Sequence, residues 1–299
     1  ISTTMNKYLC LLLALPAIYA RIEVNIVAPK DNEPQVRLYG SSVDIISDLE
    51  INTFKLGDDN LKRSTEQYFG KRPTDAYLKS PTPWGDLYKS YNWPQVTRIL
   101  SPQKARVLSL KNEPSIISTQ IFENNSTKTM QMTANIVQQV ANTISNTWDK
   151  SGELSVRQDI SYEFDMEVFK VGGTTSFGFT SRWGESTTKS ETVTVGSASG
   201  VTITLEPEQR VVAELYATKG SMRVQVDYEA SLSGSVAVNY QSPYKGHHFW
   251  SLDVNAVMAG GNLERTVESS EILDLGYYSE SRVIAIISTL SRRVGDRSV

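Results

Sequence analysis

The chain has 299 residues, of which 39% are hydrophobic and 21% charged, with 30 basic against 33 acidic side chains. This is the composition of a folded globular protein, and the net charge of −3 does not favour nucleic-acid binding. The mean hydropathy of −0.29 excludes a protein built from many membrane-spanning helices.

The first twenty residues have the pattern of a secretory signal peptide. Four residues that look like translated upstream sequence precede Met5, and Lys7 supplies the positive charge before an apolar run over 9–15. A proline and the small residue Ala20 follow, which predicts cleavage after Ala20 and a secreted, extracellular protein. A membrane anchor is the weaker alternative, because a membrane span needs roughly 20 apolar residues. Cleavage also removes Cys10, the single cysteine, and with it thiol chemistry.

Residues 21–105 predict a small mixed α+β head. The segment 21–27 alternates like a strand, 36–46 suggests a second strand pair, and 59–69 suggests a short helix. Between two prolines, 81–94 carries four aromatic residues: Trp84, Tyr88, Tyr91 and Trp93. Such rings form a platform for sugars or membrane headgroups, and they equally form the core of a small domain. The first interpretation makes these four residues candidates for receptor binding.

From residue 106 onward the pattern becomes that of long β-strands. About half of the residues in 174–204 are Ser or Thr, and interleaved Phe, Val and Ile favour strands over disorder. Residues 222–232 alternate strictly and continue the pattern to 240, which predicts one very long strand. Poor helix formers in 132–144 favour a strand over a helix there. A last strand over 283–290 is followed by a polar tail, 291–299, with a dibasic pair as a candidate protease site.

Signals for catalysis are missing from the sequence. It contains no P-loop, no dinucleotide-binding glycine motif, no zinc-protease motif and no nucleophile elbow. Its two histidines, His247 and His248, are adjacent and would point to opposite faces of a strand. We therefore expect no enzyme activity, no metal and no cofactor. Asn124 and Asn125 each begin an N-glycosylation sequon and are candidates for modification.

Residues 156–180 predict an amphipathic hairpin. The apolar face of its arms and tip consists of Ile160, Tyr162, Phe164, Met166, Val168, Phe169, Val171, Thr175, Phe177 and Phe179. The polar face consists of Asp159, Ser161, Glu163, Asp165, Glu167, Thr174, Ser176, Gly178 and Thr180. A transmembrane β-strand needs roughly 9–11 residues with this alternation, and several chains would each have to donate a hairpin to close a barrel. A half-buried hairpin of a water-soluble protein shows the same alternation.

Residues 115–240 resemble the aerolysin-type β-pore-forming family in the order of their features. Asn124-Asn125-Ser126-Thr127 ends a strand, and Asn146-Thr147-Trp148 and the hairpin follow. A Ser/Thr-rich strand over 186–204 comes next, and then 205–216 and 227–234 complete the pattern. The head lacks the cysteine-bridged lobes of aerolysin itself and is more similar to the slime-mould spherulin and its animal relatives.

The resemblance implies a mainly β protein: an elongated module of long antiparallel strands over 106–299 with a smaller head. It further implies that the head binds a receptor on a cell surface, often a glycan-bearing one. The chain would then form a homo-oligomer and insert its hairpin into membrane lipid, where Phe164 and its face contact lipid and Glu163 and its face line the pore. A non-lytic secreted binding or structural protein on the same fold is the alternative. Several members of the family carry a C-terminal peptide that blocks assembly, so cleavage at the dibasic pair with removal of 291–299 is one expectation; a frayed polar terminus with no such role is the other.

Overall fold

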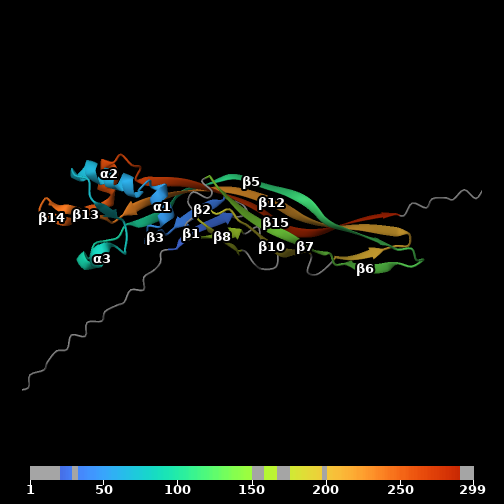
Figure 1. The fold of residues 1–299 in the computed structure, drawn as a ribbon. Coiled ribbons are helices and arrows are strands. Elements are labelled where there is room, and N and C mark those ends of the chain that lie inside the picture. Colours follow the sequence, from blue (N-terminus) through green and yellow to red (C-terminus); the bar gives the residue numbers. More distant parts are fainter. Residues whose placement is uncertain (1–20, 29–32, 150–157, 167–175, 197–200, 290–299) are drawn as a thin grey trace, which may run out of the picture.

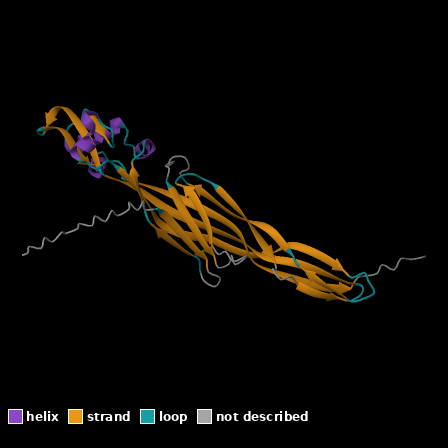
Figure 2. Ribbon diagram, turned by 90° about the horizontal axis from the view of Figure 1, so that it is seen from below, coloured by secondary structure: helices purple, strands orange, loops and turns teal. Residues whose placement is uncertain are grey.

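The computed structural model describes residues 21–28, 33–149, 158–166, 176–196 and 201–289. The predicted signal peptide and the C-terminal tail 291–299 lie outside these residues. The molecule is elongated: the helices gather at one end and long strands run from there to the other end (Figures 1 and 2). The structure therefore confirms the mainly β fold class with its long antiparallel strands.

A six-stranded antiparallel sheet forms the length of the molecule, in the order β10, β7, β15, β12, β5, β3. Three of its strands have 24 to 27 residues. At roughly 3.3 Å per residue, each is on the order of 80 Å long. The strands are β3 (Ser42–Ile45), β5 (Thr97–Glu123), β7 (Val137–Trp148), β10 (Thr188–Gly196), β12 (Gln209–Ser233) and β15 (Thr266–Thr289).

The alternating sequence of β12 is matched by alternating burial. Val224, Val226 and Tyr228 lie on one face and are at most 1% exposed. The single strand predicted through residue 240 is wrong in one respect, because the chain turns at Gly234. This residue has a φ of 112°, and a Cβ there would lie 2.2 Å from the carbonyl oxygen of Gln95. Only glycine fits, so β12 ends and a new strand begins at Ser235.

A second, four-stranded sheet lies against the first, in the order β2, β1, β8, β9. β8 and β9 are the arms of the predicted hairpin, and β1, the strand predicted over 21–27, pairs with β8 in parallel. Their buried side chains share one hydrophobic cluster with β12, β15 and β7. The two sheets therefore pack face to face. The bounds are β1 (Ile22–Ala28), β2 (Gln35–Tyr39), β8 (Asp159–Met166) and β9 (Ser176–Arg182).

The helical end combines segments that are distant in the sequence. The predicted helix over 59–69 is α2, and it packs on α4, which comes almost two hundred residues later. β4 pairs with β13, and β13 pairs with β14. None of the helices in the described part of the chain is long and apolar enough to cross a membrane. The elements are α1 (Asp48–Thr53), α2 (Asp58–Phe69), β4 (Asp75–Tyr77), α3 (Pro83–Tyr91), β13 (Ser235–Tyr244), β14 (His247–Asp253) and α4 (Val254–Gly260).

The division of the chain at residue 105 stays a prediction. Residues that are close in the sequence do not always lie at the same end of the molecule. β1, from the predicted head, lies beside the hairpin, whereas residues 235–260, from the predicted module, lie among the helices. At the opposite end, β6 (Met130–Ala134) pairs with β11 (Val201–Leu205) over a separate hydrophobic cluster. The preference for strand over helix in 132–144 is confirmed by β6 and β7.

A buried ion pair joins the long sheet to the helical end. Arg98 of β5 has no exposed surface, and its Nε donates to Glu50 Oε1 of α1 at 2.8 Å. Ser47 caps the same helix and shares a capping box with Glu50, so the carboxylate is held from two directions. Arg98 also pairs with Asp44 of β3 at 3.1 Å. These charges are matched inside the protein, which is the condition for burying them.

Candidate functional site

The register of the β8–β9 hairpin places the predicted faces as expected wherever side chains are described. Tyr162 pairs with Phe179 and Glu163 with Gly178, so equivalent faces of the two arms coincide. On the apolar face, Ile160, Tyr162, Phe164 and Phe179 are at most 4% exposed. On the polar face, Ser161 is half-buried, and the exposed members are Asp159, Glu163, Asp165, Gly178 and Thr180.

Several predicted hairpin residues lie outside the described part of the chain. These are Glu167, Val168, Phe169, Val171, Thr174 and Thr175. Met166, Ser176 and Phe177 belong to the ends of β8 and β9, where the structure defines the strand backbone. The roles assigned to the two faces, contact with lipid and lining of a pore, stay predictions.

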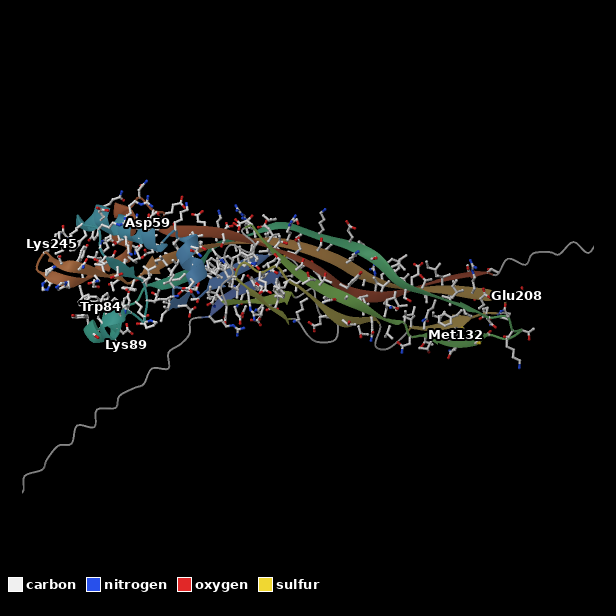
Figure 3. All side chains as sticks on the ribbon, in the orientation of Figure 1. Asp59, Trp84, Lys89, Met132, Glu208 and Lys245 are labelled. Carbon is white, nitrogen blue, oxygen red and sulfur yellow. The ribbon has the colours of Figure 1, made fainter. Side chains whose placement is uncertain are left out.

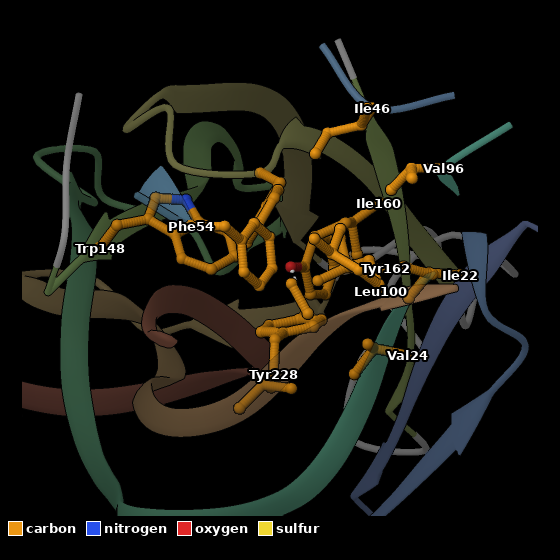
Figure 4. Packing of buried hydrophobic residues seen from close by; sticks show 14 of the residues in the cluster. Ile22, Val24, Ile46, Phe54, Val96, Leu100, Trp148, Ile160, Tyr162 and Tyr228 are labelled. Carbon is orange, nitrogen blue, oxygen red and sulfur yellow. Dashed lines mark hydrogen bonds between the residues drawn. The ribbon is translucent and has the colours of Figure 1, made fainter. Parts of the chain in front are cut away.

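The apolar face of the hairpin packs against the long sheet (Figure 4). The ring of Tyr162 lies 5.7 Å from that of Phe179, and its hydroxyl lies 2.8 Å from the hydroxyl of Tyr228 on β12. Trp148 of β7 packs on Tyr228 from the side, with ring centroids 5.3 Å apart. The hairpin is thus held to the sheet by side-chain contacts, while backbone hydrogen bonds join it only to β1 among the described strands outside the hairpin.

One carboxyl group lies inside this packed interface. Glu271 of β15 has no exposed surface, and its Oε1 accepts from Asn146 Nδ2 of β7 at 2.6 Å and from Ser181 Oγ of β9 at 3.2 Å. Its Oε2 accepts from the hydroxyl of Tyr162 and, at 3.4 Å, from that of Tyr228. Two of these four donors belong to the hairpin. No Lys, Arg or His in the described ranges forms an ion pair with Glu271.

The environment of Glu271 changes its acidity. Burial raises the pKa of this carboxyl to about 7, because the charged form loses its hydration, and the donated hydrogen bonds only partly offset that loss. Burial and the nearby Glu271 charge also raise the pKa of Tyr228 well above its ordinary value, so its hydroxyl remains a neutral donor. Glu271 therefore exchanges its proton in the neutral pH range.

The base of the hairpin is anchored separately. The backbone N–H of Trp183, just after β9, donates to the carbonyl of Gln158, just before β8. Its indole is 1% exposed, donates to Ser269 Oγ at 3.0 Å and lies under the guanidinium of Arg98 at 5.9 Å. Gln158 also accepts a short hydrogen bond from Ser42 of β3. The hairpin therefore begins and ends at a fixed point.

At the helical end, five aromatic rings form a surface that we call the aromatic patch: Tyr77, Trp84, Tyr91, Trp93 and Phe249. Tyr91 stacks on Trp93 with centroids 4.7 Å apart, and Trp84 lies 5.2 Å from Phe249. Trp84 is 48% exposed and Tyr91 is 52% exposed. Figure 3 shows Trp84 at the end of the molecule opposite Glu208.

The backbone around Trp84 is strained. Trp84, Gly85 and Asp86 have φ angles of 61°, 76° and 66°, a region that costs a non-glycine residue on the order of 1 kcal/mol or more. Two hydrogen bonds hold the turn. Ser80 Oγ donates to Asp86 Oδ1 at 2.9 Å, and the backbone N–H of Leu87 donates to Thr82 Oγ1 at 2.8 Å. The strained turn presents the indole of Trp84 at the surface.

Tyr88 differs from the other three predicted receptor-binding residues. It is 3% exposed, and its hydroxyl donates to the carbonyls of Tyr77 and Ser235 at 2.7 and 2.9 Å. It is therefore part of the core that joins α3 to β4 and β13. The aromatic residues of 81–94 therefore do not all have the same role. α3 turns Tyr88 into the core, whereas it leaves Trp84 and Tyr91 exposed at the surface, where a platform for a ligand would need them.

The two sequon asparagines also differ. Asn124 has no exposed surface, and its amide donates to the carbonyls of Lys128 and Leu205 at 2.8 and 2.9 Å. It fixes a turn, and in this fold its amide nitrogen is not accessible to a transferase. Asn125 is exposed and is the accessible acceptor of the two.

Other chemical candidates do not converge in the structure. His247 and His248 are both exposed, and His248 Nδ1 lies 2.7 Å from the carbonyl of Tyr240. Within the described residues, no three His, Cys, Asp or Glu side chains are grouped in a way that could hold a metal ion.

Glu271 and two members of the aromatic patch, Tyr77 and Phe249, are not among the site residues predicted from the sequence. A signal for Glu271 was present: it falls on the face of β15 that also carries Ser269, Leu273, Leu275 and Tyr277, all at most 6% exposed. A carboxylate on the apolar face of an alternating strand indicates a buried polar interaction. Tyr77 and Phe249 could not be found in this way, because only the pairing of β4, β13 and β14 places them beside α3.

Comparisons with known proteins agree with this architecture. The family model described as "Clostridium epsilon toxin ETX/Bacillus mosquitocidal toxin MTX2" matches residues 102–293. U-megalopygitoxin(8)-Mc8 of Megalopyge crispata is 38% identical over 280 residues, which cover 93% of this chain and 96% of that protein. U-megalopygitoxin(8)-Mo12 of Megalopyge opercularis is 37% identical, with the same coverage.

A solved structure shares the fold. Parasporin-2, a Bacillus thuringiensis toxin described as recognizing cancer cells, superimposes with a TM-score of 0.63 at 16% sequence identity, covering 84% of this chain and all of that chain. The long sheet, the packed hairpin, the family match and the toxin relatives agree. The chain belongs to the family of Clostridium epsilon toxin and Bacillus mosquitocidal toxin MTX2, which is a family of aerolysin-type β-pore-forming toxins and not of enzymes.

Proposed function

We propose that the protein is a secreted toxin that attaches to a cell surface through the aromatic patch, assembles into a homo-oligomer and inserts the β8–β9 hairpin of each subunit into the membrane. The inserted hairpins close a β-barrel, whose outer face consists of Phe164 and the other apolar residues. Glu163 and the other polar residues line the pore. A single hairpin leaves strand edges unpaired in lipid, so the proposal requires several subunits.

The observation that carries the proposal is the packing of the hairpin. Its apolar face is buried against β12 and β15, while its polar face is exposed to water. Moving the hairpin into a barrel exchanges one apolar environment for another and keeps the polar face wet. The ladder between β1 and β8, which pairs seven residues from Ile22 to Ala28 with β8, must open first.

The aromatic patch supports attachment at the other end of the molecule. Exposed Trp and Tyr rings present apolar faces and hydrogen-bonding edges together, which suits sugars and lipid headgroups. The receptor chemistry that fits this surface is therefore a glycan or a headgroup, bound away from the hairpin.

The proposal is tested by locking the hairpin to β1. In a Cys10→Ser background, Asn25→Cys and Glu163→Cys lie at paired positions of β1 and β8. Paired positions bring the two Cα atoms within the range that a disulfide spans. Resealed erythrocyte ghosts loaded with a dye should leak when the reduced protein is added and should stay intact with the oxidised protein.

A matched control joins the two arms of the hairpin to each other. Ser161→Cys and Thr180→Cys are paired across β8 and β9, so their disulfide leaves the hairpin free to leave the sheet as a unit. This oxidised protein should still cause leakage. Equal leakage from the oxidised and reduced β1–β8 lock would overturn insertion of the hairpin. Binding to the ghosts without leakage by any form would identify a non-lytic binding protein instead.

A further inference from the structure

Glu271 lies where the hairpin meets the long sheet, and its carboxyl contacts side chains from four other strands. Asn146 comes from β7, Tyr228 from β12, Tyr162 from β8 and Ser181 from β9. A side chain that is fully buried and bridges two sheets stabilises their contact only while its own polar atoms are satisfied. This single carboxyl therefore couples the position of the hairpin to its own state.

The groups around Glu271 are neutral. The titratable groups that face it are Tyr162 from β8 and Tyr228 from β12, and both phenols are neutral between pH 5 and pH 8. β7 and β9 contribute the uncharged Asn146 and Ser181. The described residues place no cation in contact with the carboxyl. An ionised Glu271 is consequently a buried charge without a counter-ion, which is costly even with four donors.

We propose that Glu271 is a proton-operated latch: its protonated form holds the β8–β9 hairpin against the sheet, and its ionised form favours release of the hairpin. Release exposes Glu271 to water, which hydrates the ionised carboxylate and removes the cost of burying it. Only the biological role of this latch rests on the proposed function, because docking and release of the hairpin can be measured in solution without a membrane.

The pKa of Glu271 in the docked and the released state sets the direction in which pH shifts the hairpin. Burial raises the pKa of docked Glu271 to about 7, from an ordinary value of 4.5 that applies once the hairpin is released. A group with a raised pKa stabilises the docked form fully below 4.5, and this stabilisation is lost as the pH rises to 7. The ratio of released to docked hairpin therefore increases on the order of 70-fold between pH 5 and pH 8.

Hydrogen-exchange mass spectrometry of the full-length protein measures this ratio. Amide protection along the β1–β8 ladder, over 22–28 and 159–166, normalised to the intrinsic chemical rate at each pH, should fall on the order of 70-fold between pH 5 and pH 8. Protection of 236–240 in β13, which lies in the helical end, should be nearly constant and serves as the internal reference. In Glu271→Gln, which cannot ionise, hairpin protection should lose its dependence on pH.

The matched control is Glu268→Gln, an exposed carboxyl on the same strand, which should keep the wild-type profile. A second variant, Tyr228→Phe, keeps the ring and removes one donor to the carboxylate, which raises the pKa of docked Glu271 further. Hairpin protection in this variant should therefore fall by more than in the wild type between pH 5 and pH 8, even if Glu271→Gln folds poorly. Constant wild-type protection, or a Glu271→Gln profile like that of the wild type, would overturn the latch. A pH-dependent hairpin in a protein that does not permeabilise ghosts would overturn insertion and leave the latch standing.

Discussion

Glu50 and Glu271 are both buried carboxyls, but the groups around them differ in charge. Glu50 is 2% exposed and lies against the guanidinium of the fully buried Arg98, so its charge is matched. Glu271 is equally buried but faces only neutral donors. The first arrangement fixes the junction between sheet and helical end at any pH at which both groups are charged. The second holds a contact whose strength depends on a proton.

The largest expected effect comes from removing the matched charge. Glu50→Gln leaves Arg98 buried without its main partner and should lower the free energy of unfolding by about 3–5 kcal/mol. Urea denaturation followed by circular dichroism measures the change. Asp48→Asn, at a carboxyl whose side chain is 91% exposed, is the control and should change stability by less than about 1 kcal/mol. A loss below about 1 kcal/mol in Glu50→Gln would show that the matched charge does not hold the junction between the sheet and the helical end.

Glu271→Gln is the matched substitution at the other carboxyl, and its effect on stability should depend on pH. Between pH 5 and pH 8, the stability of Glu271→Gln relative to the wild type should rise by about 2.5 kcal/mol, because only the wild type must keep a charge buried at high pH. The same urea series at pH 5, 6, 7 and 8 measures this difference. Glu268→Gln should show no such trend, and a flat difference for Glu271→Gln would place its ionisation outside this range.

A third expectation separates the helical end from the hairpin. Removing both exposed rings with Trp84→Ala and Tyr91→Ala should weaken binding to cells about tenfold or more, since buried aromatic anchors contribute on the order of 1–2 kcal/mol each. Urea stability and the pH profile of hairpin protection should not change. Tyr68→Ala, at a ring of α2 that is 46% exposed and outside the aromatic patch, is the control. Cell binding equal to that of the wild type would remove the patch from attachment.

The smallest expected effect concerns ion selectivity. Exposed carboxylates at Asp159, Glu163 and Asp165 would form rings inside the barrel, so the pore should prefer cations. Glu163→Lys together with Asp165→Lys should move the reversal potential in planar bilayers toward anions without abolishing conductance. Glu23→Lys, on the exposed side of β1, should have no such effect. Anion preference in the wild-type pore would contradict the assignment of faces.

Several features could be predicted from the sequence because they depend on neighbouring residues. The strand at 21–27, the helix at 59–69 and the alternation of 159–165 follow from local periodicity, and the structure confirms them. The candidate site was predicted as a hairpin with an apolar and a polar face. Its contacts with the sheet were not predicted, because alternation shows which side of a strand is buried and not what covers it.

The sequence by itself therefore determined several strands and one helix, the two faces of the hairpin and the family, since local periodicity and family motifs are properties of the chain alone. Only the tertiary structure decided that β1 lies parallel to β8, that Tyr88 is core while Trp84 is surface, and that Glu271 meets four strands. Each of these depends on segments that are distant in the sequence, such as Asn146 and Glu271, 125 positions apart. The acidity of Glu271 has the same origin, because burial, and not the residue type, sets the energy of its charge.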